Sequence, residues 1–118
     1  MTAGKVYVRQ PWADMLVSGR KRIETAHMRL PDRFAGVWLD VQTEAATIVG
    51  RVRFDGWIQW HTADAFDADG ERHLVGPHSP YHFNKRRQTF GWKVAEFEPL
   101  SQPKPAQRMR SQFRLEFY

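Results

Sequence analysis

One short stretch near the N-terminus constrains the fold more than any other part of the chain. Residues 5–9 alternate between β-forming and polar side chains, which predicts a first strand. Pro11 suits the first position of a helix, and Gly19 is typical of the residue just past a helix end. We therefore expect a strand, a short helix and, after Gly19, a second strand over residues 21–27.

The rest of the sequence contains short strands without the alternating helices of a parallel sheet. Residues 61–80, rich in Asp, His, Gly and Pro, predict an insertion loop with one helical turn at 62–66. Pro99 is expected to end a strand, and Pro103 and Pro105 to break the connection that follows. Further strands are expected over residues 37–41, 47–54 (continuing or bending through 56–60), 89–97 and 113–118.

This pattern predicts a single domain spanning residues 1–118, mainly β with α (α+β). The simplest closure is a small antiparallel β-barrel of five or six strands, with a helix after strand one. No apolar run approaches the ~18 residues of a membrane span, so we expect no membrane association. The absence of cysteine and of an apolar signal core favours a cytoplasmic location.

The positive charge is concentrated at the two ends of the sequence. The formal net charge is +5. Residues 1–30 carry six Lys/Arg against two Asp/Glu, residues 31–80 four against eight, and residues 81–118 eight against three. If the basic ends meet in space, they form a face that attracts phosphates, which favours RNA or another single-stranded nucleic acid as partner.

Several short motifs, in order along nearly the whole chain, resemble the ASCH domain family, a branch of the PUA-like β-barrel superfamily. They are Gln10-Pro11-Trp12, Gly19-x-Lys21-x-x-Glu24 within a G-x-K-x-x-E-x-R signature, Gly36 to Val41, Ile48-Val49-Gly50-x-Val52, Phe90-Gly91-Trp92-Lys93-Val94 and the proline-bearing segment Leu100 to Pro105. The resemblance implies a small PUA-like barrel and a role around RNA or modified nucleosides. Some members of the family act as ribonucleases, and others as amidohydrolases on N4-acetylcytidine.

The sequence departs from the family at two positions. The signature arginine is Ala26 here, and although His27 or Arg29 could stand in for it, both would project from the opposite face of the strand. The amidohydrolase members carry a threonine three residues after the lysine, where this chain has Glu24. Thr25 lies one residue later and would face the other side of a strand. Both departures argue against direct transfer of the amidohydrolase chemistry.

Lys21 and Glu24 are the candidate catalytic residues, if the protein is an enzyme, and also candidate ligand-binding residues. Lys21 would contact a phosphate or polarise a carbonyl, and Glu24 would accept base or ribose protons or act as general acid/base. The ordinary alternative is a solvated ion pair worth at most ~1 kcal/mol. The two residues have opposite parity on a regular strand, so a bulge or the turn at Gly19 must bring them together.

Other candidates are aromatic or basic. Gln10, Trp12 and Tyr81 are candidate ligand contacts, with a turn-bridging role for Gln10 and a core role for Trp12 as alternatives. Candidate nucleic-acid contacts are Arg9, Lys85, Arg86, Arg87, Arg108, Arg110 and Arg114. The last three share parity, so an extended strand would project them from one face.

The histidines and acidic residues at 61–82 lack any fixed metal-ligand spacing, so we expect neither a metal nor a cofactor. We expect this segment to be a flap over the site. The sequence therefore favours an RNA- or nucleotide-binding domain. A ribonuclease or modified-nucleoside amidohydrolase is the first alternative, and a protein-interaction module using the basic face is the second. The oligomeric state and the choice between RNA, DNA and a free nucleoside stay open.

Overall fold

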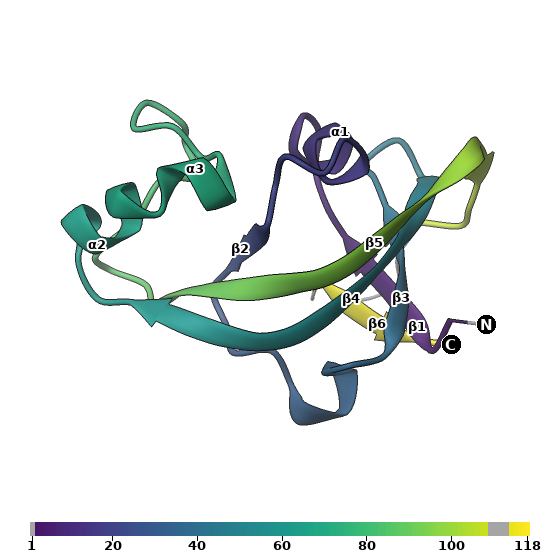
Figure 1. The fold of residues 1–118 in the computed structure, drawn as a ribbon, viewed down its shortest axis with the longest axis horizontal. Helices are drawn as coiled ribbons and strands as arrows, with labels where there is room; N and C mark the ends of the chain where they lie inside the picture. The colour runs from purple at the N-terminus through teal and green to yellow at the C-terminus, as the bar shows by residue number, and fades with distance from the viewer. Residues whose placement is uncertain (1, 109–113) are drawn as a thin grey trace.

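The structure is a computed structural model that describes residues 2–108 and 114–118. A six-stranded sheet, in the order β2-β5-β4-β3-β1-β6, curls into a half-barrel (Figure 1). Its strands are β1 (Gly4–Tyr7), β2 (Ile23–Ala26), β3 (Trp38–Gln42), β4 (Thr47–Trp60), β5 (Thr89–Pro105) and β6 (Leu115–Phe117). The pairing of β1 with β3 is parallel and the other four pairings are antiparallel. The predicted α+β class with a small barrel-like sheet is therefore confirmed, and the sheet is mixed where an antiparallel one was expected.

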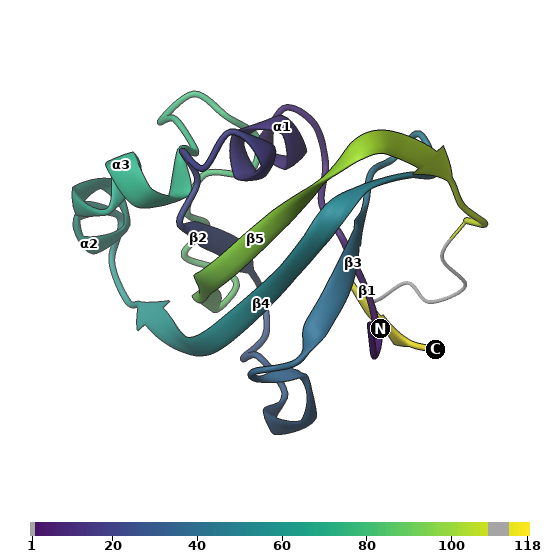
Figure 2. The same ribbon diagram turned by 45° about the vertical axis from the view of Figure 1, so that its right-hand side comes forward.

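The two longest strands, β4 and β5, pair along most of their length and give the sheet its curl (Figure 2). Their register shifts at several points, and such irregularities increase the local bend and twist. A Cβ at Gly50 would lie 2.6 Å from the carbonyl oxygen of Glu98, so the two backbones approach too closely there for any other residue.

The predictions that Pro99 ends its strand and that Pro103 and Pro105 break the following connection were wrong. β5 continues to Pro105, pairing Pro99 with Gly50 and Pro105 with Thr47. Its other neighbour, β2, pairs only as far as Lys93. Beyond that residue β5 is an edge strand, and an edge tolerates proline because one side of the strand needs no hydrogen bonds.

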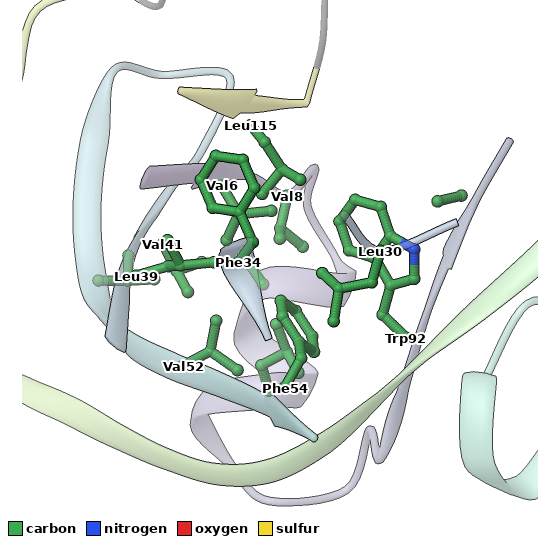
Figure 3. Close-up of a cluster of buried hydrophobic side chains, with 14 residues drawn as sticks. Val6, Val8, Leu30, Phe34, Leu39, Val41, Val52, Phe54, Trp92 and Leu115 are labelled. Atoms are coloured by element: carbon green, nitrogen blue, oxygen red, sulfur yellow. The ribbon is translucent and has the colours of Figure 1, made fainter. Parts of the chain in front are cut away.

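The main core fills the inside of the curl (Figure 3). Trp92 and Phe54 meet edge to face at its centre, with ring centroids 5.6 Å apart. Helix α1 (Trp12–Val17) closes one end, packing against β4 and β5 and burying Ala13 and Leu16. The other buried core members, from β1 to β6, are Val6, Val8, Ala26, Leu30, Phe34, Leu39, Val41, Val49, Val52 and Leu115.

The segment predicted to be an insertion loop is instead largely folded. It contains the helices α2 (Ala63–Ala68) and α3 (Gly70–His73), and Thr62 caps α2 by accepting a hydrogen bond from the Ala65 N–H. Phe66 and Val75 pack with Ile23 and Trp60 in a second core cluster. This packing fixes the helical segment against β2 and β4, and it explains why the segment is not an extended loop.

A short 3-10 helix, η1 (Asp32–Phe34), precedes β3, and its Phe34 ring stacks on Phe117 of β6. Within residues 2–108 and 114–118, no helix has both the length and the apolar character needed to cross a bilayer.

Candidate functional site

Lys21 and Glu24 meet, as the sequence predicted. Their Nζ and Oε1 atoms lie 3.7 Å apart. The turn at Gly19, where φ is +78°, reverses the chain, and the N–H groups of Arg20 and Lys21 both donate to the Met15 carbonyl. Because β2 begins only at Ile23, Lys21 lies outside the regular alternation and can point to the same side as Glu24.

The pair lies inside the protein. The side chain of Lys21 is 0% exposed and that of Glu24 5% exposed. Lys21 donates a hydrogen bond to the backbone carbonyl of His73, at the end of α3. Burial lowers the pKa of Lys21; the Glu24 carboxylate opposes this effect and the nearby Arg114 adds to it. The pair is thus a desolvated charge centre and not a solvated surface ion pair.

Arg114, just before β6, supplies the guanidinium that Ala26 cannot. Its Nη2 lies 3.2 Å from Oε2 of Glu24. Neither sequence-predicted replacement makes this contact: Arg29 lies over the Trp57 ring at 5.0 Å, and Nδ1 of His27 is 3.1 Å from the Gln88 carbonyl oxygen. A residue ninety positions away cannot be linked to Glu24 by a local motif, so sequence reasoning missed this partner.

Arg114 also joins the two open sides of the half-barrel. Its Nε and Nη2 donate to the Tyr7 carbonyl at 3.1 and 2.8 Å, and Nη1 donates to the Thr25 carbonyl of β2. The guanidinium lies 5.5 Å from the centre of the Trp92 ring. One side chain therefore satisfies carbonyls on β1 and on β2, and these strands are far apart in the order of the sheet.

Glu24 keeps one acceptor without a hydrogen bond. Oε1 accepts from the Thr25 N–H at 3.0 Å. Oε2 faces Arg114 as an ion pair, but it has no hydrogen-bond partner among the described residues. The carboxylate is thus held in place by charge on both sides, with Lys21 beyond one oxygen and Arg114 beyond the other.

Gln10 and Trp12 have structural partners in this protein. The Gln10 amide donates to Oδ1 of Asp14 at 3.0 Å, and its Oε1 accepts from the Asp14 N–H in the first turn of α1 at 3.0 Å. Trp12 donates through Nε1 to the Leu74 carbonyl at 3.1 Å. Tyr81, 49% exposed, meets the Trp12 ring edge to face, and the Arg9 guanidinium lies 5.8 Å from the Tyr81 ring centre.

A basic pocket lies at the far end of the sheet, between the end of β4 and the loop before β5. Its volume is about 340 Å³, and we call it the basic pocket. It is lined by the cations Lys85, Arg86 and Arg87, the rings of Trp60, His61 and Phe83, and the amides of Gln59 and Gln88. The three cations are exposed and form no ion pair with any described residue, and no carboxylate lines the pocket.

The predicted row of Arg108, Arg110 and Arg114 is divided. Arg108 is exposed and lies outside any strand, Arg110 falls outside the described residues, and Arg114 is bound to Glu24. The two described arginines therefore do not lie together on one strand, because β6 begins only at Leu115.

His73 is a buried residue that sequence reasoning did not single out from the other histidines. Its Nε2 lies 2.7 Å from the Phe66 carbonyl oxygen, its Nδ1 accepts from the Val75 N–H at 2.9 Å, and its ring stacks on Phe66. Burial lowers the pKa of His73, so the ring is held neutral. Among the described residues, no group of three or more His, Cys, Asp or Glu is arranged to hold a metal ion.

Comparison with solved structures supports the fold. A mutant of ZmASCH from Zymomonas mobilis carrying a tyrosine-to-phenylalanine change matches with a TM-score of 0.77 over 100% of this chain and 91% of its own, at 13% sequence identity. This chain has the ASCH fold. ZmASCH without a substitution matches with a TM-score of 0.76 at 12% identity, over 98% and 86% of the two chains. A serine-to-alanine mutant matches with a TM-score of 0.76 at 13% identity, over 98% and 87%.

No family model matches the sequence, and no curated protein does. The likeness is therefore one of structure, at an identity too low to carry an activity from ZmASCH to this chain.

Proposed function

We propose that this ASCH-fold protein binds single-stranded RNA, or a nucleotide derived from it, through the basic pocket. The observation that carries the proposal is the set of three cations, Lys85, Arg86 and Arg87, grouped around one hollow with no carboxylate partner among the described residues. Cations without internal partners attract the phosphates of a nucleic acid and release its counterions.

The rings of the pocket add a surface suited to bases. Phe83 is partly exposed beside the cations, while Trp60 is almost fully buried and forms the floor. Stacking of a base on an aromatic side chain contributes about 1–3 kcal/mol and requires no particular base. Tyr81 and Arg9, beside α1, offer a second exposed ring and cation of the same kind.

RNA hydrolysis is the second candidate, and the Lys21–Glu24 pair favours it. A lysine whose pKa is lowered by burial, beside a carboxylate, is the type of group that transfers protons near neutral pH. Because the Lys21 side chain is fully buried and its ammonium donates to the His73 carbonyl, contact with a substrate requires the surrounding chain to open. If the protein binds RNA without cleaving it, the role of the Lys21–Glu24 pair is to stabilise β2 from inside the protein.

The test is an anisotropy titration of a labelled single-stranded RNA over a salt series. A triple alanine variant at Lys85, Arg86 and Arg87 is compared with a matched triple at Arg20, Arg22 and Lys104, which are exposed cations outside the pocket lining. Both variants lose three positive charges. The pocket variant is expected to bind roughly tenfold more weakly or worse, and its slope of log affinity against log salt should fall by about 2.

Equal losses in the two variants would show that net charge, and not the pocket, drives binding. No binding by the unsubstituted protein at low salt would overturn the proposal. A cleavage assay on the same RNA with Lys21→Ala addresses the second candidate. Turnover that disappears in this variant while RNA affinity persists would make the protein a hydrolase.

A further inference from the structure

The three cations of the basic pocket are grouped at one place. Lys85, Arg86 and Arg87 are consecutive residues that line one hollow of about 340 Å³. This volume is near the lower end of the ~300–1,000 Å³ range of small-molecule sites, which suits one nucleotide and not several. A groove that binds a single strand of nucleic acid instead distributes its cations along successive phosphates.

This concentration of charge matches a phosphomonoester better than a phosphodiester. A monoester carries about −1.5 to −2 charges at neutral pH because its second pKa is about 6, and it presents three strong acceptor oxygens. A phosphodiester within a strand carries a single negative charge. Three cations around one phosphate therefore fit a terminal phosphate.

The loop leaves the phosphate contacts to its side chains. The backbone N–H of Arg86 donates to Oδ1 of Asn84 at 2.9 Å, and that of Arg87 donates to the Asn84 carbonyl at 3.0 Å. Because these two N–H groups are used within the turn, an anion must be held by the guanidinium and ammonium groups. Arginine presents its donors in a planar fork that matches phosphate oxygens in pairs.

The other residues of the lining have the chemistry to hold a base. Phe83 offers a partly exposed ring, and Gln59 and Gln88 carry side-chain amides that both donate and accept hydrogen bonds. Trp60 donates through Nε1 to Asp69 at 2.7 Å, and that carboxylate is also bound by Arg72 and does not line the pocket. Nothing in the lining therefore repels an anion.

We infer that the basic pocket holds the phosphorylated end of a nucleotide, with the terminal phosphomonoester on Lys85, Arg86 and Arg87 and its base against Phe83 and the two glutamine amides. The inference rests on the proposed RNA-binding function, and it specifies which part of the RNA enters the pocket. The same chemistry would accept a free nucleoside monophosphate, and the experiment separates the two sources.

The first measurement compares RNA oligonucleotides of one sequence that differ only at their ends. Each carries a 5′-phosphate, a 3′-phosphate or hydroxyl groups at both ends, with the fluorophore attached internally. We expect one phosphorylated end to bind about tenfold more tightly than the hydroxyl ends. This preference should disappear in Arg86→Ala/Arg87→Ala and persist in the control Arg20→Ala/Arg22→Ala.

The second measurement follows the side-chain amide resonances of Gln59 and Gln88 by NMR. Nucleoside monophosphates, the matching nucleosides and inorganic phosphate are titrated separately. Monophosphates should shift both amides at lower concentration than phosphate, and nucleosides should shift neither in the same range. Substitution of both arginines by lysine keeps the charge, removes the planar fork and should give an intermediate affinity.

The outcomes separate this inference from the proposed function. RNA binding that is equal for all three ends, with no amide shift from monophosphates, overturns the inference and leaves RNA binding intact. Amide shifts from monophosphates without binding of any oligonucleotide overturn RNA binding and support a phosphomonoester site for free nucleotides. Amide shifts that persist unchanged in Arg86→Ala/Arg87→Ala would show that the two arginines do not hold the phosphate, and this would also overturn the inference.

Discussion

The protein has two groups of cations that differ in their partners. In the first, Lys21 and Arg114 flank the buried Glu24, and their remaining donors reach backbone carbonyls. In the second, Lys85, Arg86 and Arg87 are exposed around the basic pocket, without a carboxylate partner among the described residues. Both groups lie in the basic ends of the sequence, and charge counting alone does not distinguish them.

The difference teaches that partners, and not charge alone, decide what a cation can do. Removing a buried partner leaves an uncompensated charge, so changes in the first group should act mainly on folding. Changes in the second group expose nothing and break no internal contact, so they should act mainly on ligand binding. The predictions below test this division, beginning with the largest expected effect.

Glu24→Ala is expected to be the most destabilising single substitution at the site. Among the described residues, Glu24 is the only carboxylate that pairs with Lys21 or with Arg114, and the substitution removes it. Breaking a buried charge pair in this way typically costs about 3–5 kcal/mol. Urea denaturation followed by far-UV circular dichroism measures the loss. Glu71→Ala, at an exposed helix position, is the control and should change stability by less than about 0.5 kcal/mol. A small loss of stability in Glu24→Ala would show that Glu24 interacts with Lys21 and Arg114 no more strongly than in a solvated ion pair.

Arg114→Ala should cost about 2–4 kcal/mol, because it leaves the Tyr7 and Thr25 carbonyls and the Glu24 carboxylate without their donor. Ala26 lies two residues after Glu24 on the same strand face, so an arginine there can approach the carboxylate. We expect Arg114→Ala/Ala26→Arg to recover part of the loss, as measured by a double-mutant cycle. Ala26→Lys serves as a matched cation. If the two substitutions are simply additive, Arg114 acts through the carbonyls and not through Glu24.

Acid should destabilise the protein through His73. Because burial lowers its pKa, the unfolded chain binds a proton below about pH 6.5 that the folded chain does not, and stability falls as pH drops towards the folded pKa. One such group changes the stability by at most about 1.4 kcal/mol per pH unit.

The measurement is urea denaturation from pH 7.5 to pH 5. His73→Gln should flatten the profile, and the exposed His78→Gln should leave it unchanged. Asp69 does not act in this window. Burial raises the pKa of Asp69, but hydrogen bonds from Trp60 and Arg72 outweigh this and hold it below its usual value, so its contribution is lost only at more acidic pH. A profile unaffected by His73→Gln would contradict the assignment of a neutral buried ring.

Gln10→Ala is expected to have the smallest effect. The Gln10 side chain satisfies an N–H in the exposed first turn of α1, so its loss should cost about 0.5–1 kcal/mol, measured by thermal denaturation. RNA affinity should stay the same because both ends of the amide are bound to Asp14. A clear loss of affinity with normal stability would return Gln10 to the ligand-binding residues predicted from the sequence.

The part of the site that is local in sequence could be predicted. Gly19 indicated the turn, and the turn brings Lys21 to Glu24 despite their opposite parity. The extent of burial could not be predicted, because Lys21 donates to the His73 carbonyl on a helix that the sequence presented as a polar loop. That helix is stabilised by packing of Phe66 and Val75 against Trp60 and Ile23, and not by local helix propensity.

The remaining errors share one cause, which is distance along the chain. Pro99 was expected to end a strand, but whether proline is tolerated depends on which neighbour lies beside it, and β2 stops before that point. The replacement for the missing arginine was sought at His27 and Arg29, whereas Arg114 is the residue that contacts Glu24. The cluster Lys85–Arg87 was local, so the sequence could identify it, although only the structure shows that it surrounds a pocket.

The contacts of Arg114 also constrain the order in which the chain folds during its synthesis. Tyr7 and Arg114 are separated by 107 positions, so the bond between them cannot form until almost the whole described chain has left the ribosome. Until then Lys21 and Glu24 lack their third charge, and the two sides of the sheet lack the bridge between them. Contacts this distant are slow to form because a long loop must close first. The nascent chain is therefore expected to stay open, with its edge strands exposed to chaperones, until Arg114 arrives.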